Sequence, residues 1–469
     1  MIDSRSHYHL LHVTLEAVSA HGVHTGRGDT THDSLVVRDA NGLPTLPGSS
    51  IAGVLRHAFT QMYDNAQANH LFGYINHTNS TGQASWLTVA WGMIHNSQNQ
   101  PCEGLIKNPQ NDELLCELLD SKPIVRQRVR LTEYGTAADT GKFDTTLIPA
   151  GARYTTLIGY WCDGSTDSID CWNKFLTLLQ QPYVRLGKGT RSGSGLFNII
   201  GLHHGQWDLR TSQGQQGYSQ RPRTRTSTNG LTNILSNTSG QTCSMTMQLK
   251  AESAWRIGGG ERVVLNAPTT QDKEPDLLPM HEPRITWNDG VAKLKDNESY
   301  LLPASAIKGA LRHRVAYHYY CLNKIFVQAD IKTSTDDCEA VKVLFGYALD
   351  NKQAAAGIVA IHDVLIDSSK AKQMMHNKID RFTGGVIDGA LFSELVLWQT
   401  PITLKLDILG SPTICPNIKK ALALALDDLA NGWLPLGAGG SRGLGVFSDP
   451  TGQGAQWSDN GTWIQGETV

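Results

Sequence analysis

A short glycine-containing segment carries the residues best suited to chemistry. Residues 21–39, HGVHTGRGDTTHDSLVVRD, mix aspartates and histidines with three glycines. A carboxylate can bind a divalent cation, and beside a phosphodiester it can help to activate a ribose 2′-hydroxyl. A histidine can act as a general acid or base, although loop histidines are more often surface polar residues. The candidates are Asp29, Asp33, Asp39, His21, His24 and His32.

Two glycine-rich segments suggest a second kind of chemistry. LGKGTRSGSGLF at 186–197 has four glycines with Lys188 and Arg191, and LGAGGSRGLGVF at 436–447 has five with Arg442. Glycines let the backbone approach a phosphate closely, while amides and basic side chains supply donors. Neither segment has the spacing of a Walker A loop, and neither opens a helix as a Rossmann fingerprint does. The alternative is a tight helix-to-strand turn, but the repetition favours binding of a polyanion.

Two related helix starts add possible anion sites. LPGSSIAGVLRH at 46–57 and LPASAIKGALRH at 302–313 each place serine just before an apolar helical pattern. Such serines are predicted N-caps, and the free amides of a helix N-terminus attract anions. The alternative is a capped helix with ordinary solvated charges. The residues predicted to contact RNA here are Ser49, Ser50, Arg56, Ser305, Lys308 and Arg312.

Basic residues alternate with aromatic ones in two hairpin-like blocks. Such interleaving suits single-stranded RNA, because bases stack on aromatic rings while cations neutralise phosphates. The alternative is a solvated hairpin with some aromatic core contacts. The first block holds Arg126, Arg128, Arg130, Lys142, Tyr134 and Phe143, and the second holds Lys378, Arg381 and Phe382. The RNA-binding prediction covers Arg130, Lys142, Lys378 and Arg381, and also Arg27 in the loop described first.

These motifs belong to a duplicated chain. Five collinear matches are difficult to explain except by duplication, and 469 residues suit two domains. The sequence predicts domains at 1–204 and 243–469, joined by a solvated linker at 205–242 in which Arg221, Arg223 and Arg225 could also touch phosphates. The matching pairs are 14–20 with 248–254, 46–57 with 302–313, 71–74 with 344–347, 129–141 with 377–389, and 186–197 with 436–447.

Each copy has the same predicted order of elements. Alternating apolar residues at 11–15 and 245–249 predict half-buried strands, and the pattern from Ile51 to Met62 predicts an amphipathic helix. Later helices are predicted around 172–179 and 422–429, each leading into a glycine-rich loop and a short strand. Strand, helix, hairpin-rich middle, helix and strand together predict an α+β fold of the ferredoxin-like, RRM-like type.

Composition sets limits on compartment and class. A net charge of −2 provides no global basic field, so any nucleic-acid binding must come from local patches. The eight cysteines form no CxxC pair, which argues against a zinc ribbon or a redox motif. No signal peptide and no run of 18 apolar residues is present, so we expect a cytoplasmic protein without a membrane partner.

The sequence resembles the RAMP superfamily, specifically the backbone subunits of type III CRISPR–Cas effectors. The resemblance rests on HDSLVVRDANGLPTLPGSSIAGVLR, on IDRFTGGVIDGALFSEL and on LGAGGSRGLGVF, and covers most of both copies. It implies modified ferredoxin-like domains with inserted β-hairpin thumbs. It also implies assembly with other subunits along a CRISPR guide RNA, pairing with complementary target RNA, and antiviral defence by a ribonucleoprotein complex. The tandem copies resemble the fused subunits of type III-D variants.

The resemblance also implies site residues. The family aspartate lies six residues before the second Asp of a D-x-P-V-I-R-D stretch, which matches Asp33 before Asp39, with Arg38 in place. Asp33 is therefore the implied catalytic residue and the implied holder of Mg²⁺ or another divalent cation. In the second copy Glu282 aligns with Asp33, and Asp272 or Asp276 in a longer loop could substitute; Asp276 is the tentative choice.

The resulting hypothesis is a guide-RNA-binding subunit that acts as a metal-dependent endoribonuclease on target RNA. Two alternatives stay open. One is a metal-independent endonuclease that processes guide RNA with His21 or His24 as general acid–base. The other is an RNA-binding scaffold without an active site.

Overall fold

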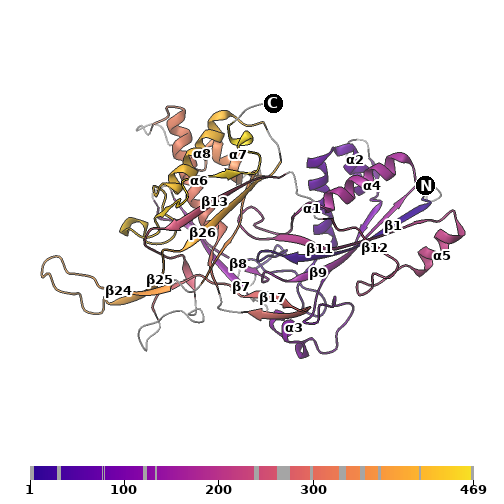
Figure 1. Cartoon of the computed structure of the whole chain (residues 1–469), viewed down its shortest axis with the longest axis horizontal. Helices are drawn as coiled ribbons and strands as arrows, with labels where there is room; N and C mark the ends of the chain where they lie inside the picture. The colour runs from indigo at the N-terminus through magenta and orange to yellow at the C-terminus, as the bar shows by residue number, and fades with distance from the viewer. Residues whose placement is uncertain are drawn as a thin grey trace.

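The computed structural model places two α+β domains side by side along the chain (Figure 1). Helices pack on one face of the main sheet in each domain, and hairpins extend from the body on the other side. The structure describes residues 5–28, 33–76, 78, 80–119, 124–132, 135–236, 242–260, 275–295, 299–326, 334–348, 354–367, 371–410 and 413–465. Within these residues, no helix is long and apolar enough to cross a membrane.

The first domain contains a four-stranded ferredoxin-like core. Its central strands lie in the order β11-β1-β9-β6, which is the 4-1-3-2 order of that fold. Helix α1 follows the first core strand, and α4 follows the third. These elements are β1 (His7–Ala17), α1 (Gly48–Met62), β6 (Gly92–Ile94), β9 (Arg153–Cys162), α4 (Thr166–Leu179) and β11 (Leu196–Asp208). Edge strands β2 (Thr45–Leu46), β5 (Leu87–Val89), β10 (Val184–Arg185) and β12 (Thr232–Asn233) extend the sheet.

The second domain repeats this arrangement. Its strands lie in the order β22-β26-β13-β27, the same 2-3-1-4 path read from the other edge. The prediction of two tandem ferredoxin-like domains is therefore confirmed. The core elements are β13 (Cys243–Ala251), α6 (Ala304–Leu322), β22 (Val359–Ile361), β26 (Pro401–Ile408), α8 (Pro416–Ala430) and β27 (Phe447–Ser448), and β28 (Gln456–Trp457) also pairs with β13.

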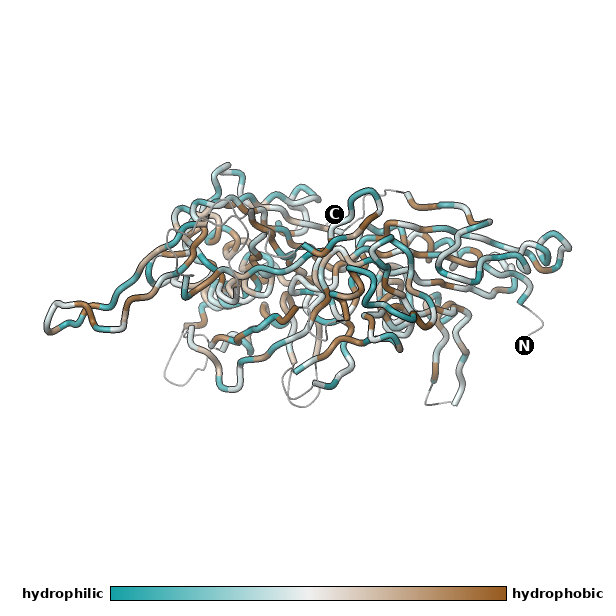
Figure 2. Tube along the Cα trace, turned by 90° about the horizontal axis from the view of Figure 1, so that it is seen from below, coloured by the Kyte–Doolittle hydropathy of each residue, from teal (hydrophilic) through white to brown (hydrophobic). Residues whose placement is uncertain are grey.

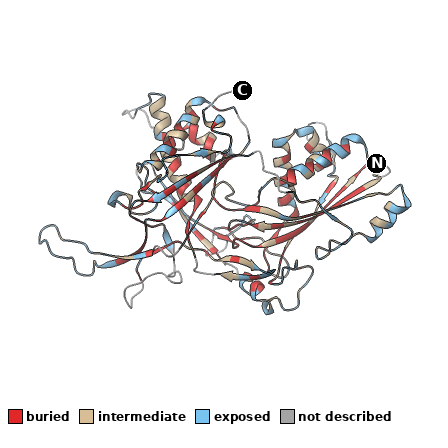
Figure 3. Cartoon of the chain, in the orientation of Figure 1, coloured by how far each residue is buried: buried red, intermediate tan, exposed pale blue. Residues whose placement is uncertain are grey.

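The apolar periodicities explain these elements. Met245, Met247 and Leu249 alternate along β13 and are all buried, while Ile51 and Leu55 lie on the buried stripe of α1. Each domain buries its own cluster of such side chains between helices and sheet (Figure 3). The shorter elements are α2 (Asn65–Phe72), β3 (Tyr74–Asn76), β4 (Thr81–Gln83), α3 (Glu113–Leu118), β14 (Ala254–Trp255), β15 (Gly258–Gly260), β16 (Leu278–Pro279), β19 (Ser299–Leu302), α7 (Glu339–Phe345), β20 (Gly346–Ala348), β21 (Ala354–Ala356), β23 (Val364–Asp367) and α9 (Thr462–Gln465).

Each domain carries an inserted β-hairpin before its third core strand. In the first domain, β7 (Ile124–Leu131) pairs with β8 (Ala137–Leu147); we call this hairpin the thumb. In the second, β24 (Ala371–His376) pairs with β25 (Phe392–Trp398) and forms, with the connecting residues 377–391, what we call the finger. The finger extends away from the body (Figures 1 and 2), whereas the thumb makes contacts with the second domain.

A second hairpin joins the two domains. Strands β17 (Arg284–Asn288) and β18 (Val291–Lys295) belong to the second copy in sequence, yet Ile285 and Ala292 are buried in the core of the first domain. The amide of Ile285 donates to Ala150 O at 2.8 Å. The indole of Trp287 donates to Gly151 O at 2.7 Å and lies under the guanidinium of Arg153 at 4.0 Å. We call β17–β18 the clasp.

Residues 205–242, expected to be a solvated linker, are built into the first domain as far as the structure describes them. Strand β11 continues to Asp208, helix α5 (Ser212–Gln220) follows, and β12 pairs with β11. Arg225 forms an ion pair with Glu103 at 2.6 Å, and its carbonyl accepts a hydrogen bond from His12 Nε2. Polar composition concealed this packing, because α5 and β12 bury few apolar side chains.

Candidate nucleic-acid interface

Three elements from the two copies meet at one junction. The thumb strand β7 and the glycine-rich loop 186–197 come from the first copy, and helix α6 comes from the second. Ser192 forms a parallel bridge with Ile361, and Arg191 Nε donates to Gly357 O at 2.5 Å. Gly193 has φ +90°, and a Cβ there would clash with the Asp363 carboxylate and Ala304. Glycine is therefore required where this loop approaches the start of α6.

Four cations gather at this junction and form what we call the basic cluster: Arg128, Arg191, Lys308 and Arg312. Burial lowers the pKa of Lys308 to about 8, and the positive charges of Arg312, Arg191 and Arg128 act in the same direction. Burial, and then the neighbouring Arg126, lower the pKa of Arg128. The Nε of Arg128 is buried and has no hydrogen-bond partner among the described residues. These groups repel one another, so a bound anion would stabilise them.

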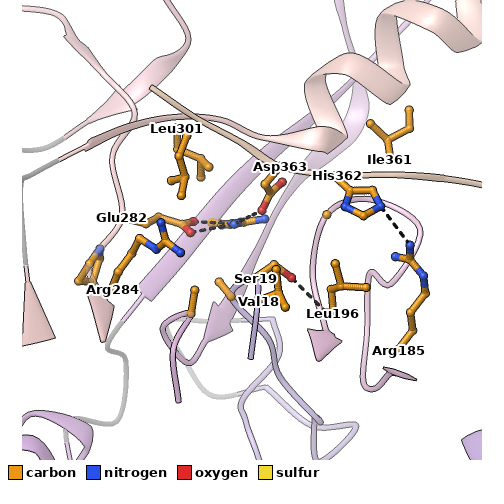
Figure 4. Close-up of a pocket in the computed structure, with 16 residues that line it drawn as sticks. Val18, Ser19, Arg185, Leu196, Glu282, Arg284, Leu301, Ile361, His362 and Asp363 are labelled. Carbon is orange, nitrogen blue, oxygen red and sulfur yellow. Dashed lines mark hydrogen bonds and ion pairs between the residues drawn. The ribbon is translucent and has the colours of Figure 1, made fainter. Parts of the chain in front are cut away.

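A buried ion network holds the thumb to the second domain beside the basic cluster. Arg126 is 1% exposed and contacts two carboxylates, Glu282 at 2.8 Å and Asp363 at 2.7 Å (Figure 4). Burial alone would lower the pKa of Arg126, but the two carboxylates outweigh that effect and raise it. Burial raises the pKa of Asp363. The paired charges thus fix how β7 lies on the second copy.

A second network joins the copies on the far side of a small cavity of about 70 Å³. Arg185 of β10 forms an ion pair with Asp407 of β26, and His362 Nε2 lies 2.7 Å from the same carboxylate. Figure 4 shows Glu282 and Asp363 of the first network and Arg185 and His362 of the second lining this cavity, with His362 facing Arg185. Ion pairs therefore join the two copies on both sides of the cavity.

The loop aspartates lie against the hairpins. Asp33 is exposed, its amide donates to Asp144 Oδ1 at 2.9 Å, and the Asp144 amide donates to Asp33 Oδ2 at 3.0 Å. In the second copy Asp276 takes the corresponding place, because the Ser393 amide donates to Asp276 Oδ2 at 2.8 Å. The alignment of Glu282 with Asp33 was wrong, since Glu282 is buried against Arg126. Asp29, His32 and Asp272 lie outside the described residues.

Asp33 offers one exposed carboxylate to a divalent cation of the Mg²⁺ type. Such ions are bound by one or two carboxylates together with oxygens of a phosphate substrate, rather than by a complete protein cage. The part of the chain that the structure describes has no group of three or more histidine, cysteine or acidic side chains placed to hold a metal. Any such ion would depend on RNA for further ligands.

The two loop histidines have structural partners. His21 is 1% exposed, its Nε2 lies 2.8 Å from Tyr154 Oη, and burial lowers its pKa to about 3. His24 Nε2 donates to Thr146 O at 2.9 Å, and burial also lowers its pKa. Both side chains are therefore neutral near pH 7 and hold the loop to the sheet and the thumb, which does not favour a general acid–base role for either.

The helix starts differ from the predicted ones. Pro47 and Pro303 occupy the N-cap positions of α1 and α6, so Ser49, Ser50 and Ser305 lie within the first turns and cap nothing. The cap prediction was wrong because each serine follows a Pro-Gly or Pro-Ala pair that already enters the helix. At α6 the Asp363 carboxylate accepts the Ala304 amide at 2.8 Å, so the protein supplies its own anion there.

The other predicted RNA contacts fall into three groups. Arg56 bonds to Gly73 O and Asn69 and holds α1 to α2. Arg130 reaches Asp336, the same residue that pairs with Arg312, so it lies at the edge of the basic cluster. The remaining ones are exposed at scattered places: Arg27 in the first loop, Lys142 on the thumb, Lys188 and Arg442 on the glycine-rich loops, and Lys378 and Arg381 on the finger.

The structure thus brings together Arg191, Lys308 and Arg312, and adds Arg128, which was not among the predicted RNA-binding residues. The alternation of Arg126, Arg128 and Arg130 along one strand was a usable signal, because alternate strand residues share a face. Only the tertiary contacts show that Arg126 is a buried ion-pair partner while Arg128 joins the basic cluster.

Comparison with known proteins finds matches among solved structures and family models. A chain of the structure described as "Type III-B Cmr-beta Cryo-EM structure of the Apo state" is similar over 40% of this chain and 96% of its own length, at 14% identity and a TM-score of 0.32. No curated protein matches this chain. The RAMP superfamily matches twice, over residues 14–198 and 248–448, which are the two ferredoxin-like domains found above. The chain therefore belongs to the RAMP superfamily and carries two tandem copies of its domain.

Proposed function

We propose that this chain is a guide-RNA-binding backbone subunit of a type III CRISPR effector complex and that it cleaves complementary target RNA in a metal-dependent way. The basic cluster carries the proposal. Its cations come from both RAMP copies, and among the described residues only Asp336 forms an ion pair with one of them. An RNA backbone supplies phosphates in a row, and their charge would relieve the repulsion within the cluster.

The finger supports contact with bases. Phe382 is 98% exposed, and Ile379, Val386 and Leu391 are also exposed, while Lys378 and Arg381 lie beside them. An exposed apolar tip of this kind marks a binding surface, and aromatic rings beside cations suit stacked bases and phosphates. The family resemblance implies that such hairpins lie against the guide–target duplex.

The proposed chemistry places Asp33 beside the target strand. The ribose 2′-hydroxyl gives up its proton to solvent and attacks the adjacent phosphate, so an O2′–P bond forms, the P–O5′ bond breaks, and the 5′-oxygen takes up a proton from solvent as it leaves. A divalent cation held by Asp33 would stabilise the charge that develops on the phosphate. The hydrogen bonds between Asp33 and β8 hold the carboxylate at the base of the thumb. Asp276 would serve in the same way at a second cut.

Cleavage by the assembled complex tests the catalytic part. With guide RNA, target RNA and Mg²⁺, Asp33→Ala is expected to abolish one cut and Asp276→Ala a second, with target binding retained. EDTA should abolish both cuts. Asp139→Ala, an exposed aspartate on the same strand β8, is the matched control and should cut normally. Persistence of both cuts in the double variant would leave the chain as an RNA-binding scaffold.

Guide-RNA binding by the full chain tests the basic cluster. Arg128→Gln with Lys308→Gln should weaken binding at least about tenfold and make the slope of log K against log salt less steep by about 0.7 for each phosphate that is no longer neutralised. Lys420→Gln, an exposed lysine on α8, is the control. Equal affinity of the cluster variant and the control would exclude this route for the RNA.

A further inference from the structure

The loop aspartate of each copy is tied to its hairpin by a reciprocal pair of hydrogen bonds. In the first copy the Asp33 amide donates to a side-chain oxygen of Asp144, and the Asp144 amide donates back to the Asp33 carboxylate. In the second copy the Asp276 amide donates to Ser393 Oγ at 3.4 Å, and the Ser393 amide donates back to the Asp276 carboxylate at 2.8 Å. The two copies therefore share the same pattern of hydrogen bonds.

The next contacts show that these are equivalent positions. After Asp33, Ser34 O accepts the Thr146 amide at 3.3 Å, two residues beyond Asp144. After Asp276, Leu277 O accepts the Leu395 amide at 2.9 Å, two residues beyond Ser393. The two loops therefore run along their hairpin strands in the same register, with Asp276 and not Glu282 opposite Asp33.

The two copies differ chemically at one position of this pattern, which is Asp144 in the first copy and Ser393 in the second. A carboxylate occupies it in the first copy and a hydroxyl in the second, and both accept the hydrogen bond from the loop amide. The hydroxyl of Ser393 also lies 3.3 Å from Asp276 Oδ2, so it can donate to the carboxylate that it helps to place. Both side chains therefore offer a hydrogen-bond acceptor to the loop amide. The side chain of Asp144 is negatively charged, and that of Ser393 is not.

We propose that Asp144 and Ser393 are positioning residues. Each fixes where the carboxylate of Asp33 or Asp276 stands by accepting the amide hydrogen of that aspartate, and the charge of Asp144 is dispensable. The proposal rests on the proposed function, because the position of these carboxylates affects cleavage only if the two loop aspartates are catalytic. A carboxylate misplaced by about an ångström can lose two orders of magnitude in rate, so such an anchor has a measurable effect.

Three substitutions at Asp144 separate an acceptor from a charge. Asp144→Ala removes the acceptor, Asp144→Asn keeps a carbonyl acceptor without charge, and Asp144→Ser installs the group found in the second copy. In the assembled complex we expect Asp144→Ala to slow the first cut about 10- to 100-fold, without loss of target affinity. Asp144→Asn and Asp144→Ser should stay within a few-fold of wild type, with an unchanged pH profile. Ser393→Ala should slow only the second cut.

Hydrogen exchange on the full chain gives a readout that is independent of cleavage. The Asp33 amide should exchange faster in Asp144→Ala and stay protected in Asp144→Asn and Asp144→Ser. Asp139→Ala, on the same strand, should alter neither exchange nor cleavage.

Two results would overturn the proposal. If Asp144→Asn cuts as poorly as Asp144→Ala while the Asp33 amide stays protected, the charge of Asp144 acts directly. If Asp144→Ala cuts and exchanges like wild type, the side chain does not position the loop. Failure of the proposed function is distinguished by Asp33→Ala, since normal cutting by that variant removes the catalytic role, while exchange still decides whether Asp144 anchors the loop.

Discussion

At the scale of single residues, the junction combines charges that are balanced with charges that are not. Arg126 has two buried carboxylates within hydrogen-bonding distance, whereas Arg128, two residues along the same strand, has a buried nitrogen without a partner among the described residues. Burying an unpaired charge is costly, and removing one partner of a buried pair leaves such a charge behind. The balanced charges therefore hold the domains together, and the unbalanced ones are available for a ligand.

The lowered pKa of Lys308 predicts how RNA binding depends on pH. The pKa of Lys308 is about 8 without RNA, and a bound phosphate would raise it. Above that pH, Lys308 therefore takes up a proton when RNA binds. Affinity should be full below about pH 7 and fall as pH rises, to about tenfold weaker at pH 9. Binding titrations between about pH 6.5 and 9.5 check this. Lys308→Arg should bind with little pH dependence, and an unchanged slope in that variant would assign the effect to another group.

Removing Arg126 should destabilise the junction in a pH-dependent way. Arg126→Met leaves Glu282 and Asp363 buried without a cation, at a cost of about 3–5 kcal/mol near pH 8. Burial already raises the pKa of Asp363, and the variant lacks the Arg126 charge that opposes this effect, so the folded state binds a proton that the unfolded state does not. The deficit should therefore shrink as pH falls towards about 5. Urea unfolding at both pH values measures this, and Arg210→Met, an exposed arginine, is the control.

At the scale of elements, the clasp links the two copies. It comes from the second copy, yet it completes the hydrophobic core of the first through Ile285 and Ala292. The Ala292 amide also donates to Ser97 O at 2.8 Å, so backbone hydrogen bonds accompany the burial. The first domain is consequently not a closed unit without residues that lie far along the chain.

Truncating the clasp should therefore destabilise the first domain. Ile285→Ala leaves a cavity in that core and should cost about 2–5 kcal/mol. Val291→Ala lies on the same hairpin at a 38% exposed position and should change stability by less than about 0.5 kcal/mol. Hydrogen exchange should show faster opening of β6 and β9 in the first variant. Faster opening confined to the second domain would contradict the role of the clasp.

At the scale of the whole molecule, the two copies are equivalent in fold but not in surroundings. Gly193 and Gly443 occupy matching places in the two glycine-rich loops. The first lies against Asp363 and Ala304 of the second copy, whereas a Cβ on the second would have nothing described within 4 Å. The described residues thus form this loop contact in the first copy, and nothing among them covers the corresponding position of the second copy.

This difference predicts unequal effects of the same substitution. Alanine adopts φ near +80° to +90° at a cost of about 1 kcal/mol at either position, but only Gly193→Ala also forces the junction apart. Gly193→Ala should lower the melting temperature by several degrees more than Gly443→Ala and should weaken guide-RNA binding. Equal melting temperatures and equal affinities would show that the loop does not hold the junction.

The sequence by itself determined the duplication, the α+β class and the elements that form the core. Those features depend on local periodicity and on repeated motifs, as in Met245, Met247 and Leu249 on β13 or Ile51 and Leu55 on α1. A local apolar pattern shows which face of an element is buried, so it can be recognised without knowing which other elements pack against that face. The polar segment after β11 was misjudged for the same reason, because its order depends on contacts rather than on an apolar pattern.

Only the tertiary structure decided which charges meet. Glu282 and Arg126 are separated by 156 residues and pair across the two copies, whereas sequence alignment had matched Glu282 with Asp33. Lys308 and Arg128 likewise come from different copies, and Asp276 is identified with Asp33 only by its hydrogen bonds to Ser393. Contacts of this kind are set by the packing of one domain on the other and by the path of a longer loop, and neither is encoded in the residues near the contact.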